Sequence, residues 1–140
     1  MSLNLIVDGT PKENYKKFIT VYSGSEKSKR PVIFYFEGTG KDGTWCNWCK
    51  NASVTFASFV KRNTHLDIWK VGVGSEEEWK KTEDGKRINS FYENFPYILT
   101  VPTLVVVAVY HDGLRVASRI SIPEDPTSLD FDKVVSLYVK

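Results

Sequence analysis

Two cysteines three positions apart are the residues of this chain best suited to chemistry. Cys46 and Cys49 are the only cysteines, and they stand in the run Trp45-Cys46-Asn47-Trp48-Cys49. A thiolate attacks disulfides, and its pKa falls at a helix N-terminus, where unpaired backbone N–H groups stabilise negative charge. A second thiol one helical turn later can resolve the mixed disulfide that results. The spacing therefore indicates dithiol–disulfide exchange, with Cys46 attacking from the exposed helix end and Cys49 resolving.

A structural zinc site or a structural disulfide is the other use of such a pair. A structural zinc normally needs four ligands, and the remaining candidates, His65 and His111, are far apart in the sequence. A structural disulfide belongs to oxidising compartments, and the chain starts without the basic and long apolar regions of a signal peptide. We therefore expect no metal, and a cytoplasmic location in which the thiols stay reduced.

Two further segments attract attention because of their glycine and proline residues. Pro102 follows Val101 at the start of an apolar stretch, where a strand tolerates a residue without an N–H group. The glycine-rich segment 38–44 precedes the cysteines. It lacks the Gly-Lys-Ser/Thr ending of a phosphate-binding loop, because Asp42 follows Lys41. We therefore expect segment 38–44 to be a connector and not a phosphate site.

Regular elements are expected to place the cysteines between a strand and a helix. Residues 31–36 form a β-branched and aromatic run typical of a central strand buried on both faces. A helix is predicted from the cysteines to about Arg62, with four inward residues: Val54, Phe56, Phe59 and Val60. The remaining predictions are strands at 3–7, 66–73, 102–110 and 114–122, a hairpin turn at 111–113, and helices at 11–22, from 75 onward, 86–95 and 130–139. This order predicts an α/β domain, a mixed sheet with helices on both faces.

The composition fits one globular domain. The chain has 140 residues, of which 41% are hydrophobic and 26% charged, and this is a usual size for a single core. The formal net charge of +2 is too small to indicate a nucleic-acid or membrane-surface partner. No apolar run approaches the roughly 20 residues of a transmembrane helix. We therefore expect residues 1–140 to form one domain with neither kind of partner.

These motifs together carry a resemblance to a known family. A buried strand followed by Trp-Cys-x-x-Cys, a later Val-Pro-Thr and a terminal helix look like the thioredoxin fold. More closely, the run from Tyr35 to Cys49, including Lys41-Asp42-Gly43, resembles the thioredoxin domain-containing protein 17 family. The similarity extends over about residues 11 to 139. It implies a thioredoxin fold, disulfide reduction in the cytosol, and a cis-proline at Pro102 that faces the cysteines.

The resemblance also implies partners and a substrate groove. No cofactor is expected to be bound, and the reducing equivalents are expected from thioredoxin reductase and NADPH. The substrates implied are small disulfides or those of selected proteins. Val101 is expected to offer its backbone N–H and C=O to the extended chain of a substrate, a strand-addition mode of recognition. Trp45, Asn47 and Trp48 are expected to support or line the groove.

Two departures from the related sequences bear on the site. Asn47-Trp48 stands between the cysteines, where the family usually has Pro-Asp. We expect this difference to affect the redox potential and the substrate preference more than the type of reaction. Tyr35 stands at the position of the buried aspartate of thioredoxin. The family also lacks that aspartate. The proton of Cys49 is therefore expected to move to loop groups, Lys41 or Asp42, or to water.

Three functions remain open at this point. The first is a dithiol–disulfide oxidoreductase, which the presence of both thiols favours. The second is a non-catalytic thioredoxin-like module that binds a partner, and the third is a glutathione-coupled, glutaredoxin-like enzyme. Segment 38–44 and Trp48 add bulk beside the cysteines, and obstruction of wrong partners is a common source of selectivity. We therefore expect poor reduction of large substrates such as insulin.

Overall fold

The computed structural model describes residues 3–25, 31–40, 43–95, 98, 100–109 and 115–121. The elements, in chain order, are β1 (Leu3–Ile6), α1 (Pro11–Gly24), β2 (Val32–Glu37), α2 (Asn47–Arg62), β3 (Asp67–Gly72), α3 (Glu76–Lys80), β4 (Thr82–Glu83), β5 (Lys86–Arg87), α4 (Ser90–Asn94), β6 (Thr103–Val109) and β7 (Arg115–Ser121). The predicted turn at 111–113 and helix at 130–139 lie outside the described residues, as do Lys41 and Asp42.

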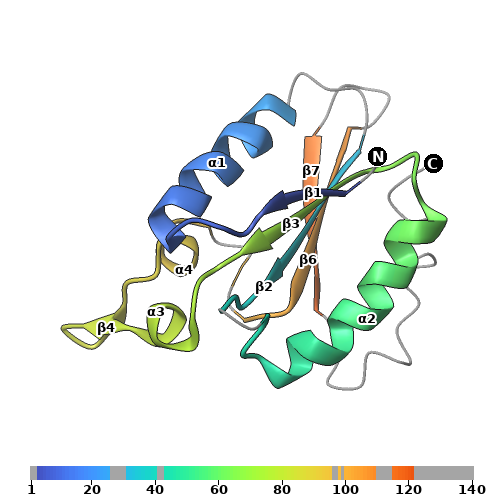
Figure 1. The fold of residues 1–140 in the computed structure, drawn as a ribbon. Coiled ribbons are helices and arrows are strands. Elements are labelled where there is room, and N and C mark those ends of the chain that lie inside the picture. The colour runs from blue at the N-terminus through green and yellow to red at the C-terminus, as the bar shows by residue number, and fades with distance from the viewer. Residues whose placement is uncertain are drawn as a thin grey trace.

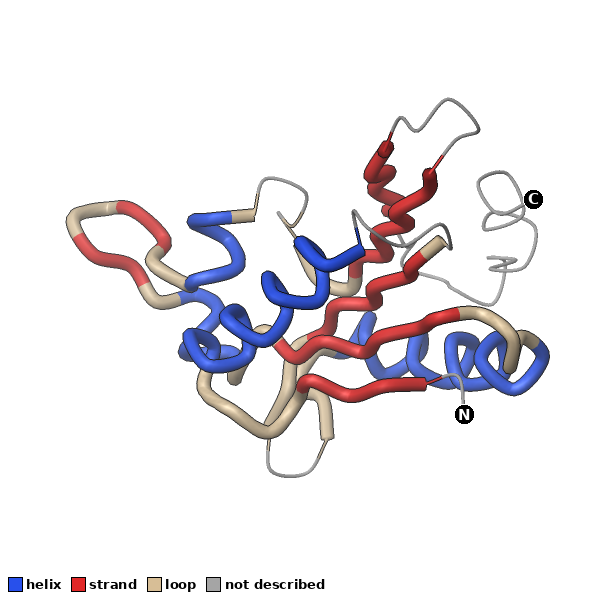
Figure 2. Tube along the Cα trace, turned by 90° about the horizontal axis from the view of Figure 1, so that it is seen from above, coloured by secondary structure: helices blue, strands red, loops and turns tan. Residues whose placement is uncertain are grey.

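Five strands form one mixed sheet in the order β1-β3-β2-β6-β7. Strands β1 and β2 run parallel to β3, whereas β6 is antiparallel to both β2 and β7. Helix α1 covers one face of the sheet and α2 the other (Figure 1). The view from above shows the same two layers of helix on either side of the strands (Figure 2). The α/β prediction of a mixed sheet between helices is therefore confirmed.

The position of strand β2 between two helices explains why its sequence is apolar as far as Phe36. All six of its residues are buried, because each face of the strand meets a helix. On one face, Phe34 and Phe36 contact Phe18 of α1, with ring centroids 5.0 and 5.1 Å apart. On the other face, Tyr35 stacks on Phe56 of α2 at 4.2 Å. The period-2 alternation of a strand thus supplies two separate cores.

Two capping boxes set the starts of α1 and α3. The hydroxyl of Thr10 accepts from the Glu13 amide, and the Glu13 carboxylate accepts from the Thr10 amide. Ser75 and Glu78 make the same reciprocal pair. Each box satisfies N–H groups that a helix start leaves unpaired. Both starts lie where the sequence predicts them.

The segment after β3 holds three distant parts of the fold together. Three consecutive carbonyl groups each accept a hydrogen bond from a side chain of another element. The side-chain amide of Asn14 in α1 donates to the Gly72 carbonyl at 3.0 Å, and the side-chain amide of Asn89 donates to the Val73 carbonyl at 2.9 Å. The Trp45 indole donates to Gly74 at 2.8 Å. Helix α1, the start of α4 and the loop before the cysteines are therefore fixed to one short stretch of backbone.

The predicted helix at 86–95 is wrong over its first half. Lys86 and Arg87 form β5, which pairs with β4 across a turn at Asp84-Gly85, and α4 begins only at Ser90. Asp84 and Gly85 both have positive φ, 52° and 77°, as a two-residue hairpin turn requires. This hairpin projects from the body beside α3 (Figures 1 and 2).

The inward face predicted for α2 is correct in part. Phe56 and Phe59 are buried and Val60 is partly buried against the core, but Val54 is 71% exposed. The buried stripe of α2 starts at Cys49 and passes through Ala52 to Phe56, so Val54 falls on the solvent side of the helix. Within the described residues, none of the helices combines the length and apolar character needed to cross a bilayer.

Candidate active site

Cys46 occupies the N-cap position of α2, as predicted, but the expected exposure is wrong, because the packed residues around the cap leave Cys46 only 8% exposed. Its backbone is extended (φ −82°, ψ 117°), and its sulfur accepts a hydrogen bond from the Cys49 amide at 3.1 Å. The sulfur thus fills the place that a serine or aspartate oxygen takes in an ordinary N-cap. The unpaired N–H groups of the first helical turn are directed at the atom that would carry negative charge.

The two thiols are free and differ sharply in acidity. The pKa of Cys46 is lowered to about 7, mainly because the Cys49 thiol donates to its sulfur, with help from the amides of Cys49 and Trp48. Burial and the negative charge of Glu37 oppose this shift. The pKa of Cys49 is raised, because its proton is engaged by Cys46 and because it is fully buried. Near neutral pH, Cys46 is partly a thiolate and Cys49 is a thiol.

The Val101–Pro102 peptide bond is cis, as the family resemblance implies, and it lies beside the cysteines. The antiparallel register that pairs Phe36 with Thr103 brings the start of β6 to the same end of the sheet as the loop after β2. The Val101 carbonyl oxygen is 3.7 Å from the Cys46 sulfur, which donates to it when protonated. The two predicted site segments are therefore brought together.

Trp45 packs under the loop that leads to Cys46. Besides its hydrogen bond to Gly74, its indole ring lies so close to Gly38 that a Cβ atom there would overlap the ring. The ammonium group of Lys80 on α3 is 5.9 Å from the centre of the ring. Trp45 is thus held between the loop after β2 and the segment after β3, and it fixes the approach of the chain to Cys46.

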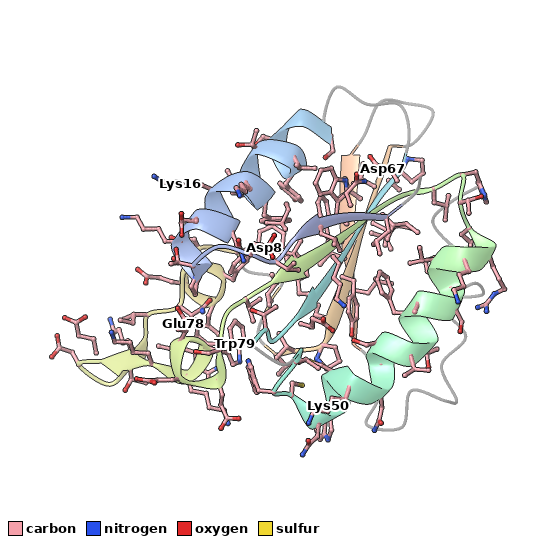
Figure 3. All side chains as sticks on the ribbon, in the orientation of Figure 1. Asp8, Lys16, Lys50, Asp67, Glu78 and Trp79 are labelled. Atoms are coloured by element: carbon pink, nitrogen blue, oxygen red, sulfur yellow. The ribbon has the colours of Figure 1, made fainter. Side chains whose placement is uncertain are left out.

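Asn47 and Trp48 lie at the surface. Trp48 is 48% exposed, although it stands directly between the cysteines in the sequence. Lys50 is also exposed, and it projects from the first turns of α2, at the end of the molecule opposite Asp67 (Figure 3). The surface next to Cys46 therefore presents an accessible indole ring and a positive charge one turn away.

Glu37 is a site residue that the sequence interpretation did not identify. Its side chain is buried at the end of β2, where one carboxylate oxygen is 2.8 Å from the Lys70 ammonium group of β3. The other oxygen accepts a hydrogen bond from the Ser53 hydroxyl of α2 at 2.6 Å. The only feature of the sequence that could have indicated Glu37 as a site residue is its charge at the end of an otherwise apolar strand. Its charge raises the pKa of Cys46, so it belongs to the electrostatic surroundings of the dithiol.

A pocket of about 240 Å³ connects Glu37 with solvent. Glu37 and Lys70 form part of its wall, together with Leu5, Asp8, Thr39 and Gly43. Asp8 follows β1 and lies near the first turn of α1 (Figure 3). The pocket lies outside the carboxyl ends of the parallel strands, a common place for functional groups in α/β folds. The Glu37 carboxylate, although buried, therefore lines a pocket that is open to solvent.

Tyr35 lies on the same face of β2 as Glu37. The residue is fully buried, and its hydroxyl has no hydrogen-bond partner in the part of the chain that the structure describes. Its pKa is raised, chiefly by burial and then by the negative charges of Glu37 and Cys49. The hydroxyl therefore stays protonated near neutral pH.

Metal ligands are not gathered at this site. Over the described ranges, no three or more His, Cys, Asp or Glu side chains come together as a metal site would require. His65 is exposed after the end of α2, far along the chain from the cysteines. The functional groups brought together are two thiols, a carboxylate, an ammonium group and two hydroxyl groups.

Comparisons with known proteins agree with this geometry. The family model described as "Thioredoxin domain-containing protein 17-like, thioredoxin domain" matches residues 11–119. None of the curated protein sequences matches the chain significantly.

Two solved thioredoxins have similar structures. The thioredoxin of Fasciola hepatica gives a TM-score of 0.54 at 16% identity, over 96% of this chain and 98% of that one. The thioredoxin of Nicotiana alata gives a TM-score of 0.60 at 13% identity, over 99% of this chain and 94% of that one. These likenesses show the thioredoxin fold. The family model and the adjacent cysteines support a role of the thiol–disulfide oxidoreductase type. The chain belongs to the thioredoxin domain-containing protein 17-like family.

Proposed function

We propose that this protein is a dithiol–disulfide oxidoreductase that reduces small disulfides and those of selected proteins in the cytosol. The observation that carries the proposal is the acidity of Cys46, whose sulfur caps α2 and has a pKa of about 7. A thiol with a pKa near the ambient pH combines a large thiolate fraction with high nucleophilicity. Residues 1–140 would act as one domain, with neither a nucleic-acid nor a membrane partner.

In the first step the Cys46 thiolate attacks one sulfur of the substrate disulfide. A bond forms between Cys46 and that sulfur, the substrate S–S bond breaks, and the other sulfur leaves as a thiolate that takes a proton from water. Val101 stands beside the attacking sulfur, and its backbone N–H and C=O are offered to the extended chain of a peptide substrate.

In the second step Cys49 resolves the mixed disulfide. Its thiol loses a proton, its sulfur attacks Cys46, and the bond between Cys46 and the substrate breaks. We assign the proton to the Glu37 carboxylate, in place of the loop groups Lys41 and Asp42 or the water that the sequence suggested. Glu37 is buried, its charge acts on Cys46, and it lines the pocket together with Lys70 and Asp8.

Two electrons pass from the dithiol to the substrate in this cycle. The oxidised Cys46–Cys49 pair must then be reduced again, and we propose thioredoxin reductase with NADPH as the donor. We propose that the domain needs no bound cofactor for either step, because the two electrons come from its own thiols, Cys46 and Cys49.

Selectivity is proposed to come from the surroundings of Cys46. Trp48 is 48% exposed, and the segment from Gly38 to Thr44 is expected from its length to add bulk on one side of the pair. Both features narrow the flat apolar surface that a large folded substrate needs, while an exposed indole can anchor a fitting one. Small disulfides are therefore the expected preferred substrates, and insulin a poor one.

A coupled assay tests the proposal. NADPH consumption is followed with thioredoxin reductase, and in parallel with glutathione and glutathione reductase, using cystine as substrate. Turnover in the first arm that Cys46→Ser abolishes supports the proposed function. Turnover only in the second arm would indicate a glutaredoxin-like enzyme instead, and none in either arm would leave a partner-binding module.

A further inference from the structure

Charge is unevenly distributed along the segments that meet at the cysteines. Residues 43–66, which include the approach to Cys46 and the whole of α2, contain no aspartate or glutamate but three cations: Lys50, Lys61 and Arg62. Residues 100–108, which include the start of β6 beside Cys46, contain no charged residue. Helix α2 is therefore a basic helix, and it begins at the candidate active site.

Lys50 is the cation of α2 that lies one helical turn from Cys46. Its backbone amide donates to the Cys46 carbonyl at 2.9 Å, which closes that turn. Its side chain is exposed and projects from the first turns of α2 (Figure 3). Among the described residues, no carboxylate makes an ion pair with it. The charge of Lys50 is therefore available to a molecule that approaches Cys46.

Two other charged groups near the site are engaged with partners. The Lys80 ammonium group, 5.9 Å from the centre of the Trp45 ring, lies 3.6 Å from the Glu76 carboxylate, which offsets its charge. Glu37 is buried, and its oxygens contact a lysine of β3 and a serine of α2. Even so, the negative charge of Glu37 acts against the Cys46 thiolate. An anionic molecule that approaches Cys46 therefore meets repulsion from Glu37 and from the thiolate itself.

We propose that Lys50 is a specificity-determining residue, which favours disulfides that carry a carboxylate close to the sulfur under attack. The inference rests on the proposed function and narrows its class of substrate. A cation one turn from Cys46 attracts such a carboxylate and offsets the repulsion that the thiolate and Glu37 exert on it. Opposite charges across an encounter also raise the rate of association. Lys50 itself makes and breaks no bond, and the thiol–disulfide exchange at Cys46 and Cys49 is the same for every substrate.

Two peptide disulfides of equal size test the preference, one with glutamate and one with glutamine next to each cysteine. The reduced protein is mixed with each peptide, the reaction is quenched with acid, and the released peptide thiol is measured by chromatography. The ratio of the two rates, glutamate peptide over glutamine peptide, should fall about 2- to 5-fold in Lys50→Gln, the effect of losing one exposed ion pair. Lys61→Gln is the control, since it removes the same charge from the same helix, about 16 Å farther along its axis. An unchanged ratio in Lys50→Gln overturns the inference, and so does an equal fall in Lys61→Gln.

Alkylation of Cys46 gives a second measurement that needs no disulfide. Iodoacetate is anionic and iodoacetamide is neutral, and both react with the thiolate, so the ratio of their rates is independent of the pKa of Cys46. This ratio should also fall about 2- to 5-fold in Lys50→Gln and stay unchanged in Lys61→Gln. At an ionic strength of about 1 M, where charges are screened beyond ~3 Å, the unmodified protein and Lys50→Gln should give equal ratios. If the unmodified protein reduces neither peptide, the proposed function fails, whereas an alkylation ratio at low salt that is the same with and without Lys50 overturns the inference alone.

Discussion

The backbone amide of Cys49 is directed at the sulfur of Cys46, 3.1 Å away. Cys49 thus donates to the Cys46 sulfur both from its backbone amide and from its thiol. These two contacts are among the main causes of the lowered pKa of Cys46. The interaction depends on the helical turn between them, since three residues of α2 are what bring the amide back to the cap. Acidity and resolution therefore come from the same residue.

Alkylation should report this acidity directly. Because the thiolate is the nucleophile, the rate at which iodoacetamide labels Cys46 should rise with pH through a midpoint near 7. Cys49 is fully buried with a raised pKa and should stay unlabelled in the folded protein. Peptide mass spectrometry after timed labelling measures both rates. Faster labelling of Cys49 than of Cys46 would reverse the assigned roles.

Two substitutions at Cys49 should separate its two contributions. Cys49→Ser and Cys49→Ala should both accumulate mixed disulfides with substrate, because neither can resolve them. Serine keeps a hydroxyl that can donate to Cys46, whereas alanine keeps only the amide. The pKa of Cys46, read from the alkylation profile, should therefore rise more in Cys49→Ala than in Cys49→Ser. Equal values in the two variants would show that the side chain at this position does not contribute.

Glu37→Gln should lower the pKa of Cys46 while slowing the second step. The carboxylate repels the Cys46 thiolate, so removing its charge favours the thiolate and shifts the alkylation midpoint below that of the unmodified protein. The same change removes the assigned proton acceptor for Cys49. Glu77→Gln, an exposed position on α3, is the control for loss of one negative charge. A midpoint that rises in Glu37→Gln contradicts the electrostatic argument.

Gly38→Ala should destabilise the protein by roughly 1–3 kcal/mol, the usual range for overpacking. A Cβ atom at Gly38 overlaps the Trp45 ring, which is itself held by Gly74 and cannot move freely. Gly24→Ala is the matched control, because a Cβ atom there meets nothing within 4 Å. Urea unfolding followed by tryptophan fluorescence gives both values. Similar unfolding free energies for the two variants would mean that the contact of Trp45 with Gly38 is not tight.

Trp48→Ala should raise the rate of insulin reduction relative to that of cystine. Trp48 lies in the first turn of α2 that Cys46 caps, and its exposed indole is expected to obstruct a large substrate more than a small one. Val54→Ala removes another exposed apolar side chain from α2, farther along the helix, and should leave the ratio unchanged. The ratio of the two rates is measured with one electron donor throughout. If the unmodified protein reduces insulin and cystine equally well, the selectivity argument is wrong, although the redox assignment stands.

The elements that carry the cysteines could be predicted because their signals are local. The N-cap role of Cys46 follows from a strand, a loop and a helical periodicity that lie next to one another in the chain. The hairpin at Asp84-Gly85 was equally local, but the helical pattern after it was given more weight than the turn dipeptide. The prediction that Val54 faces the core was wrong because Val54 and Phe56 are two residues apart. That spacing places two residues on one face of a strand but not on one face of a helix.

The cluster around Glu37 could not be predicted in the same way. Its partners Ser53 and Lys70 come from a helix and a neighbouring strand, and only the register between β2 and β3 brings them together. Tyr35 was recognised as a replacement for an acidic residue, but its unpaired hydroxyl is a property of the packed core. Long-range register and burial, which no local pattern contains, decide these contacts.

The three carbonyl groups that follow β3 limit where this chain can change in length. A residue inserted between Gly72 and Val73 would shift the two later carbonyls past their donors, so the anchors of the start of α4 and of Trp45 would fail together. Among the described residues, no other element makes such a set of hydrogen bonds to the turn at Asp84-Gly85, which lies at the tip of a projecting hairpin (Figure 1). Insertions and deletions among relatives are therefore expected at that tip, whereas the spacing from β3 to α3 stays constant.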